Sequence, residues 1–182
     1  MPKLKLTFIA ALLLVSGICS GQKVITRYIN HFLPVAKMLS AEYGIPVSII
    51  MGVSTLESGS GTSLNAKQLN NYFGVTGRNS LKKRHSVYKQ YAKPEDSFRD
   101  FCDIVSRKKF YHGLKDNLNY GKWLAAMNHA SYAGAKSIWI DRVTQIVKKY
   151  HLDQYNEWFK GLFKAKVQKL KESYKEHGID LF

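Results

Sequence analysis

The chain has 182 residues, of which 45% are hydrophobic and 13% aromatic, enough for one domain with a well-filled core. Its formal net charge is +15, from 28 Lys and Arg against 13 Asp and Glu. Such an excess of positive charge predicts a polyanionic partner: nucleic acid, an anionic membrane surface or an acidic cell-wall polymer. Composition alone does not choose among these three classes.

The first 21 residues have the layout of a secretory signal peptide. Two lysines precede an apolar stretch, Leu6 to Val15, which small residues follow and which is too short to span a bilayer. We therefore expect residues 1–21 to be removed and the protein to be periplasmic or extracellular, which argues against nucleic acid as its partner. A lipoprotein acylated at Cys19 is the weaker alternative, because Ile18 interrupts the small residues usual before such a cysteine.

Export also changes the meaning of the cysteines. With Cys19 removed or modified, Cys102 is left alone, so no intramolecular disulfide is expected. Cys102 lies on the apolar face of a predicted helix, which favours a small buried hydrophobic residue over a nucleophile.

Helical periodicity dominates the rest of the chain. Gly44 ends the first predicted helix and Pro46 opens the second, each a residue type suited to that position. A helix beginning at Pro94 has Glu95 and Asp96 in its first turn, where the helix dipole favours acids. Predicted helices cover residues 25–43, 46–57, 63–69, 94–105, 120–130, 138–150 and 154–176.

Two segments have a different pattern. Residues 70–92 have strand-like stretches around a turn at 78–80, which predicts a small β-hairpin. Residues 156–182 form an amphipathic, lysine-rich helix that we expect to dock on the domain; the alternative is that it lies on an anionic membrane or wall surface.

Glu57 is the candidate catalytic residue. It ends an apolar helical run and is the last carboxylate before Glu95, with seven basic residues between the two. Desolvation and a position at a helix C-terminus both raise a carboxyl pKa, as a group that protonates a leaving oxygen requires; nearby basic residues would oppose them. The glycines that follow allow a ligand to approach closely. The alternative is a solvated surface glutamate followed by a flexible loop.

Four motifs in order carry a resemblance. Leu56–Ser63 reads L-E-S-G-S-G-T-S, and Asn70–Gly74 reads N-N-Y-F-G. Tyr91 is followed by S-F-R-D-F at Ser97–Phe101, and A-S-Y-A stands at Ala130–Ala133. Over roughly residues 28–155 this pattern resembles the glucosaminidase domain of glycoside hydrolase family 73, whose members are peptidoglycan hydrolases of the lysozyme-like superfamily.

The resemblance implies roles for individual residues. Glu57 matches the catalytic general acid, and Tyr132 matches an active-site tyrosine that supports the reaction or the substrate. Asn71 and Phe73 match the motif that shapes the substrate-binding wall, and Tyr91 belongs to the same expected substrate-binding set. Each also has a purely structural interpretation: Asn71 could cap a turn, and Phe73 could fill the core.

The chain departs from the family pattern in one respect. The family has a proposed second carboxylate on the hairpin after N-N-x-F-G, whereas residues 72–93 here contain no acid. Glycosidases with two carboxylates need a base or nucleophile beside the bond, and substrate-assisted enzymes are a recognised exception. Two routes therefore stay open: attack by the substrate's own 2-acetamido group, or attack by water oriented by Tyr132 or by a distant acid.

Together these features predict a mainly α (α+β), lysozyme-like helical domain over residues 22–155, with a small β-hairpin lobe over a catalytic cleft. The predicted function is hydrolysis of β-1,4 bonds after N-acetylglucosamine by a monomeric endo-β-N-acetylglucosaminidase acting on peptidoglycan strands. Residues 82–85, K-K-R-H, could bind wall carboxylates or form a solvated turn. The scattered histidines have no metal-ligand spacing and no phosphate-binding loop occurs, so we expect neither a cofactor nor a metal. The rivals are a lytic transglycosylase and a decayed wall-binding module.

Overall fold

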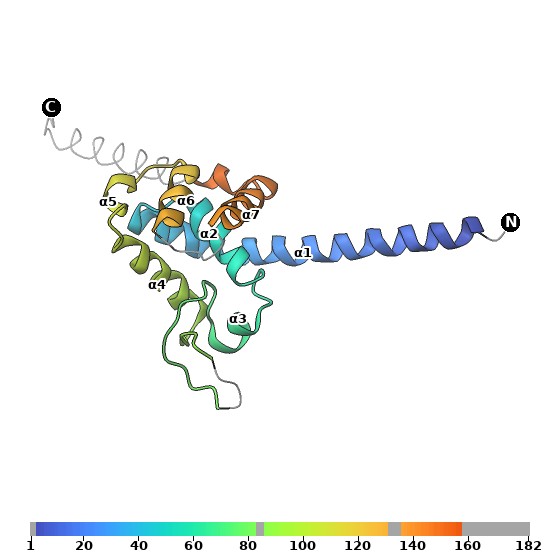
Figure 1. Ribbon diagram of the computed structural model, residues 1–182, viewed down its shortest axis with the longest axis horizontal. Coiled ribbons are helices and arrows are strands. Elements are labelled where there is room, and N and C mark those ends of the chain that lie inside the picture. The colour runs from blue at the N-terminus through green and yellow to red at the C-terminus, as the bar shows by residue number, and fades with distance from the viewer. Residues whose placement is uncertain (1–2, 83–85, 131–135, 158–182) are drawn as a thin grey trace, which may run out of the picture.

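The computed structural model describes residues 3–82, 86–130 and 136–157, with side chains from Gly21 onward except at 136 and 137. Three predicted features lie outside the described residues. They are Tyr132, residues 83–85 of the basic turn, and most of the tail helix. The fold is mainly helical, as predicted, and α1 (Lys3–Tyr43) extends well beyond the rest of the molecule at its N-terminal end (Figure 1). None of the described helices is long and apolar enough to cross a membrane.

A buried central helix organises the core. In α2 (Val47–Glu57) every residue from Val47 to Thr55 is buried, as expected for a helix that is apolar all round. It packs against α1, α4 (Pro94–Ser106), α6 (Tyr120–His129), α7 (Lys136–Lys149) and the 3₁₀ helix η1 (Leu152–Tyr155). The C-terminal end of α2 is therefore a fixed point in the fold.

Helix boundaries follow the sequence signals closely. Gly44 ends α1 with φ +65°, and its N–H bonds to Ser40 O at 2.9 Å. Ser63 caps α3 (Leu64–Leu69), and its side chain accepts a hydrogen bond from Ala66 N at 3.1 Å. Cys102 is fully buried on the apolar face of α4, as predicted. The one-turn helix α5 (Tyr111–Leu114) was not predicted, because four residues carry too short a period.

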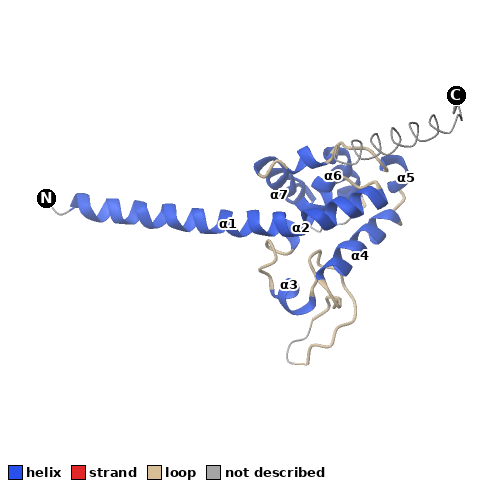
Figure 2. Ribbon diagram, turned by 180° about the vertical axis from the view of Figure 1, so that it is seen from behind, coloured by secondary structure: helices blue, strands red, loops and turns tan. Residues whose placement is uncertain are grey.

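The predicted β-hairpin is not confirmed. The described part of residues 70–92 has a single antiparallel bridge, Thr76 to Tyr88, and no extended strand, so Figure 2 draws it as loop. Backbone bonds from Gly77 N to Val87 O and from Lys89 N to Val75 O, both 2.8 Å, hold the two arms together. The segment has the course of a hairpin without a regular ladder of hydrogen bonds.

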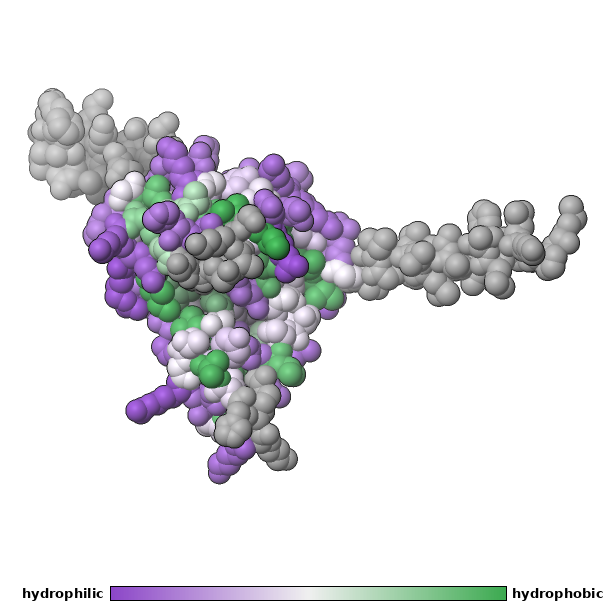
Figure 3. All heavy atoms as spheres, viewed as in Figure 1, coloured by the Kyte–Doolittle hydropathy of each residue, from purple (hydrophilic) through white to green (hydrophobic). Residues whose placement is uncertain are grey.

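The outer surface matches the basic, polar composition. Hydrophilic residues cover much of the periphery of the face shown in Figure 3, and smaller hydrophobic patches lie toward its middle. The core beneath contains a run of stacked rings: Phe32 on Phe98 at 4.8 Å and Phe73 on Phe101 at 4.2 Å between ring centroids. These rings join α1, the 70–92 segment and α4 into one body.

Candidate active site

Glu57 lies where α2 meets a tightly hydrogen-bonded turn. Ser60 N bonds to Thr55 O at 2.8 Å, and Ser63 N bonds to Ser58 O at 3.0 Å. Ser58 is buried, and its hydroxyl donates to Ser54 O at 2.6 Å and accepts from Gly61 N at 2.9 Å. The turn is thus ordered by internal bonds, which argues against the alternative of a flexible loop behind a surface glutamate.

Left-handed backbone makes this exit sharp. Gly59, Ser60 and Gly61 all have positive φ, between 56° and 77°. Glycine adopts this conformation most readily, and two of the three residues are glycines. Gly61 also packs on a ring, since a Cβ there would lie 3.2 Å from Tyr28 Cδ2. The glycines therefore let the chain turn away directly after Glu57.

The Glu57 carboxyl has two different sides. Trp139 Nε1 in α7 donates a hydrogen bond of 2.9 Å to Glu57 Oε1. Oε2 faces the N-N-x-F-G segment: a Cβ placed on Gly74 would lie 3.9 Å from Oε2 and 3.8 Å from Tyr88 Cε1. Residues from α2, α7 and the 70–92 segment thus meet at the carboxyl group of Glu57, a residue that is exposed as a whole.

The surroundings of Glu57 raise the pKa of its carboxyl. Partial burial is the larger cause, because protein atoms around the group disfavour its charged form, and the hydrogen bond from Trp139 acts in the opposite direction. Among the described residues no charged side chain contributes to this shift. A raised pKa keeps more of the carboxyl protonated toward neutral pH, as a general acid requires.

The three predicted substrate-binding residues are buried. Asn71 Nδ2 donates to Val75 O and Lys89 O, both at 2.8 Å, and Asn71 Oδ1 accepts from Val75 N at 3.1 Å. Phe73 lies in the ring stack, and the Tyr91 hydroxyl donates to Asp100 Oδ2 at 2.7 Å. Contact between these side chains and a substrate stays a prediction; their positions favour shaping the wall from inside.

Two of the acids that follow Glu57 have structural partners. Asp96 Oδ2 accepts from Lys93 N at 3.3 Å at the start of α4, the helix-start role predicted for it. Asp100 pairs with Lys89 at 2.7 Å in addition to Tyr91. No cluster of three or more His, Cys, Asp or Glu suited to a metal ion occurs among the described residues.

Sequence reasoning missed Trp139 and Tyr88 as neighbours of the site. Trp139 lies in the helix predicted over residues 138–150, and it follows the A-S-Y-A motif closely in the chain. That proximity was the signal that could have found it.

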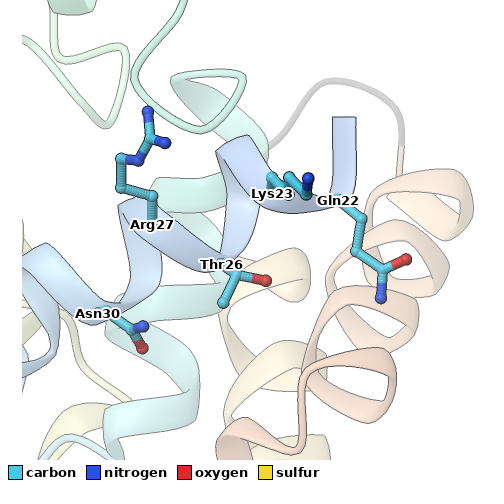
Figure 4. A pocket seen from close by; sticks show the side chains of 5 residues that line it. All are labelled: Gln22, Lys23, Thr26, Arg27 and Asn30. Carbon is cyan, nitrogen blue, oxygen red and sulfur yellow. The ribbon is translucent and has the colours of Figure 1, made fainter. Parts of the chain in front are cut away.

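A surface hollow on α1, lined by Gln22, Lys23, Thr26, Arg27 and Asn30, contains none of the predicted site residues (Figure 4).

Comparison with known proteins places this arrangement in a family. The profile described as mannosyl-glycoprotein endo-beta-N-acetylglucosaminidase matches residues 33–152. The chain belongs to the glucosaminidase family. The resemblance to glycoside hydrolase family 73 drawn from the motifs is confirmed, and the matched glucosaminidase region lies inside the predicted domain of 22–155.

A curated relative extends this result. The exo-glucosaminidase LytG of Bacillus subtilis (strain 168) is 28% identical over 142 residues, covering 67% of this chain and 50% of LytG. The chain therefore spans about half the length of this relative. The family likeness rests on the aligned half of LytG, and the activity of whole LytG does not by itself transfer to this chain.

Solved structures share the fold of this glucosaminidase domain. The catalytic domain of the autolysin Auto from Listeria monocytogenes has a TM-score of 0.60 at 20% identity, covering 72% of this chain and 87% of that domain. The peptidoglycan hydrolase from Sphingomonas sp. A1, solved as a mutant, has a TM-score of 0.57 at 19% identity, with coverages of 71% and 96%. The glycoside hydrolase domain of FlgJ from Salmonella typhimurium reaches 0.53 at 18%, with coverages of 84% and 96%. The predicted lysozyme-like fold is thereby confirmed.

Proposed function

We propose that this protein hydrolyses the β-1,4 bonds after N-acetylglucosamine in peptidoglycan, with Glu57 as general acid. The observation that carries the proposal is the partly buried Glu57 carboxyl, whose pKa is raised and which accepts a hydrogen bond from Trp139 at the end of a buried helix. The family supplies the reaction class, and the structurally similar peptidoglycan hydrolase from Sphingomonas sp. A1 suggests the polymer.

In the proposed first step Glu57 donates its proton to the glycosidic oxygen as the bond to the sugar C1 breaks. Because residues 72–93 contain no acid, the favoured nucleophile is the substrate's own 2-acetamido oxygen, which forms the new bond to C1. Water then adds to C1, and the bond between C1 and the acetamido oxygen breaks. The Glu57 carboxylate takes a proton from that water. Direct attack by water, oriented by Tyr132 or a distant acid, is the competing route.

Two observations differ on where along the glycan the enzyme cuts. The family description says endo-acting, whereas the printed name of LytG says exo-acting. We propose the endo mode, which follows from the family rather than from one relative aligned over half its length. An exo enzyme would release small products from the first minutes of digestion, whereas an endo enzyme would first shorten long strands.

The proposed location is the cell wall, reached by export with residues 1–21 as signal peptide. The protein would act there as a monomer, with its positive charge facing an acidic polymer. Cell fractionation followed by N-terminal sequencing of the mature protein tests this part. A mature chain found in the wall fraction and beginning near residue 22 is the expected result.

Digestion of purified peptidoglycan, analysed by mass spectrometry and NMR, tests the reaction. The expected products carry reducing N-acetylglucosamine ends with retained configuration at C1. Ends of the 1,6-anhydromuramyl type would instead identify a lytic transglycosylase, and wall binding without any product would identify a binding module. Net inversion at C1 would rule out the acetamido route while leaving Glu57 as the acid.

A further inference from the structure

We infer that Trp139 is a positioning residue that gives the two oxygens of Glu57 different tasks. It holds Oε1 as a hydrogen-bond acceptor, so that Oε2 carries the proton delivered to the sugar. The inference rests on the proposed role of Glu57 as general acid. Trp139 itself need not touch the substrate, because it acts through the carboxyl group.

Trp139 is itself held firmly by the fold. Its side chain is 5% exposed and belongs to the hydrophobic core, while its indole N–H reaches Glu57 Oε1 at 2.9 Å. The close packing of α7 on α2 depends on Gly52, where a Cβ would lie 3.1 Å from Val143 Cγ1 and 3.1 Å from Val147 Cγ2. The donor and the acceptor therefore sit on two helices whose spacing is fixed by contact.

The chemistry of the donor decides which oxygen is protonated. An indole N–H donates and cannot accept a hydrogen bond, so Oε1 must offer it a lone pair in both protonation states. A carbonyl oxygen accepts better than an acid hydroxyl does, which places the proton of the neutral carboxyl on Oε2. The N–H bond also favours the carboxylate that remains after proton transfer.

Oε2 has the open approach that a proton donor needs. The residue it faces is Gly74, whose φ of +68° suits glycine and whose lack of a side chain leaves the space beside Oε2 free. A titratable residue next to Gly74 is Tyr88, whose Cε1 would lie 3.8 Å from a Cβ on Gly74. On α7 the ionisable neighbours of Trp139 in sequence, Asp141 and Arg142, are exposed.

Replacing Trp139 by Phe removes the N–H donor and keeps an aromatic ring. Without that bond the carboxyl rotates more freely and its charged form loses support, so kcat should fall about tenfold while KM stays within about twofold. The pKa of Glu57 should rise, which moves the alkaline limb of the pH profile upward by about half a unit.

The chain offers a matched control in Trp123→Phe. Trp123 is fully buried, and its indole N–H donates to Asn117 O at 2.8 Å, so this variant loses the same kind of bond away from Glu57. It should lower the melting temperature but leave the pH profile in place. A folded Trp139→Phe enzyme with wild-type kcat and an unmoved pH profile would overturn the inference.

A measurement on the unmodified side chain avoids the risk that Trp139→Phe fails to fold. The indole ¹⁵N–¹H resonance of Trp139 in the wild-type protein should shift as Glu57 titrates, with a midpoint above the ordinary pKa of a glutamate, and Glu57→Gln should abolish that shift. The Trp123 resonance serves as internal reference. A stationary Trp139 resonance contradicts the inference even if the enzyme digests wall, whereas a wild-type protein that digests no wall contradicts the proposed function instead.

Discussion

The turn after α2 and the segment 70–92 both border the Glu57 carboxyl, yet they are stabilised in different ways. Backbone bonds of a buried helix and its C-terminal turn hold the first. The second has one isolated bridge and depends on side chains that bond to backbone. The acid therefore stands on a rigid element, and the wall beside it depends on a few polar residues.

Two asparagines replace much of the missing sheet. Asn71 connects Val75 with Lys89 across the segment, and Asn79 Nδ2 donates to Ser86 O at 2.8 Å and Tyr88 O at 2.9 Å. Each amide thus ties the two arms together where a regular ladder would use several residues. Single substitutions in this segment should therefore have larger effects than typical surface changes.

Asn71→Ala should produce the largest loss. It removes three short hydrogen bonds and leaves part-buried backbone groups unpaired, which predicts a destabilisation of about 2–4 kcal/mol. Wall digestion should fall more than stability alone explains, because Gly74 lies in the loop that Asn71 closes. Asn79→Ala is the control: it also removes three hydrogen bonds, two across the arms and one from Leu81 N to Asn79 Oδ1, and should retain more activity. Denaturant unfolding measures the stability of both variants, and wall digestion measures their activity. Equal activity of the two variants would contradict the proposed importance of the position of Gly74.

Gly52→Val tests the helical side of the comparison. The added side chain would press on Val143 and Val147, which predicts a loss of about 1–3 kcal/mol and a displacement of α7. Activity should fall as Trp139 moves away from Glu57. Gly113→Val, at an exposed position with open space around it, should leave both stability and activity nearly unchanged. A fully active Gly52→Val enzyme would show that α7 does not control the carboxyl.

Asp100 gives a smaller, pH-dependent effect. Burial alone would raise the pKa of Asp100, but hydrogen bonds from Lys89 and Tyr91 outweigh it and lower the pKa. A lowered pKa means stability that is present above the unfolded value, near pH 4, and lost as pH falls through the folded value. Asp100→Ala should cost about 1 kcal/mol at pH 7, since Lys89 is half-exposed, and less near pH 2.5. Asp100→Asn, which still accepts a hydrogen bond from Tyr91, should cost less stability than Asp100→Ala. Thermal unfolding at both pH values measures the two losses. A loss for Asp100→Ala that does not depend on pH would contradict the prediction.

The same contrast explains what the sequence could predict. Helical period, Gly44, Pro46 and Ser63 are local signals, and the helix ends that these three residues mark are present within a residue or two. The start of the first helix was predicted at residue 25, whereas α1 begins at Lys3. The 70–92 segment has strand-like residues, but its polar amides close the loop in place of a ladder. The bond between Trp139 and Glu57 joins residues 82 apart, and no local pattern encodes the register of α7 on α2. Tyr132 lies outside the described residues, so its predicted role stays a prediction.

The central claim is that the Glu57 carboxyl performs acid catalysis on peptidoglycan. Digestion of purified wall by Glu57→Gln tests it most directly, because Gln still accepts the Trp139 bond and keeps the size of the side chain. The control is Glu42→Gln, an exposed acid on α1 that pairs with Arg99. We expect Glu57→Gln to unfold at the wild-type temperature or slightly above and to release no reducing ends, while Glu42→Gln stays active. Near wild-type release of reducing ends by Glu57→Gln would contradict the account.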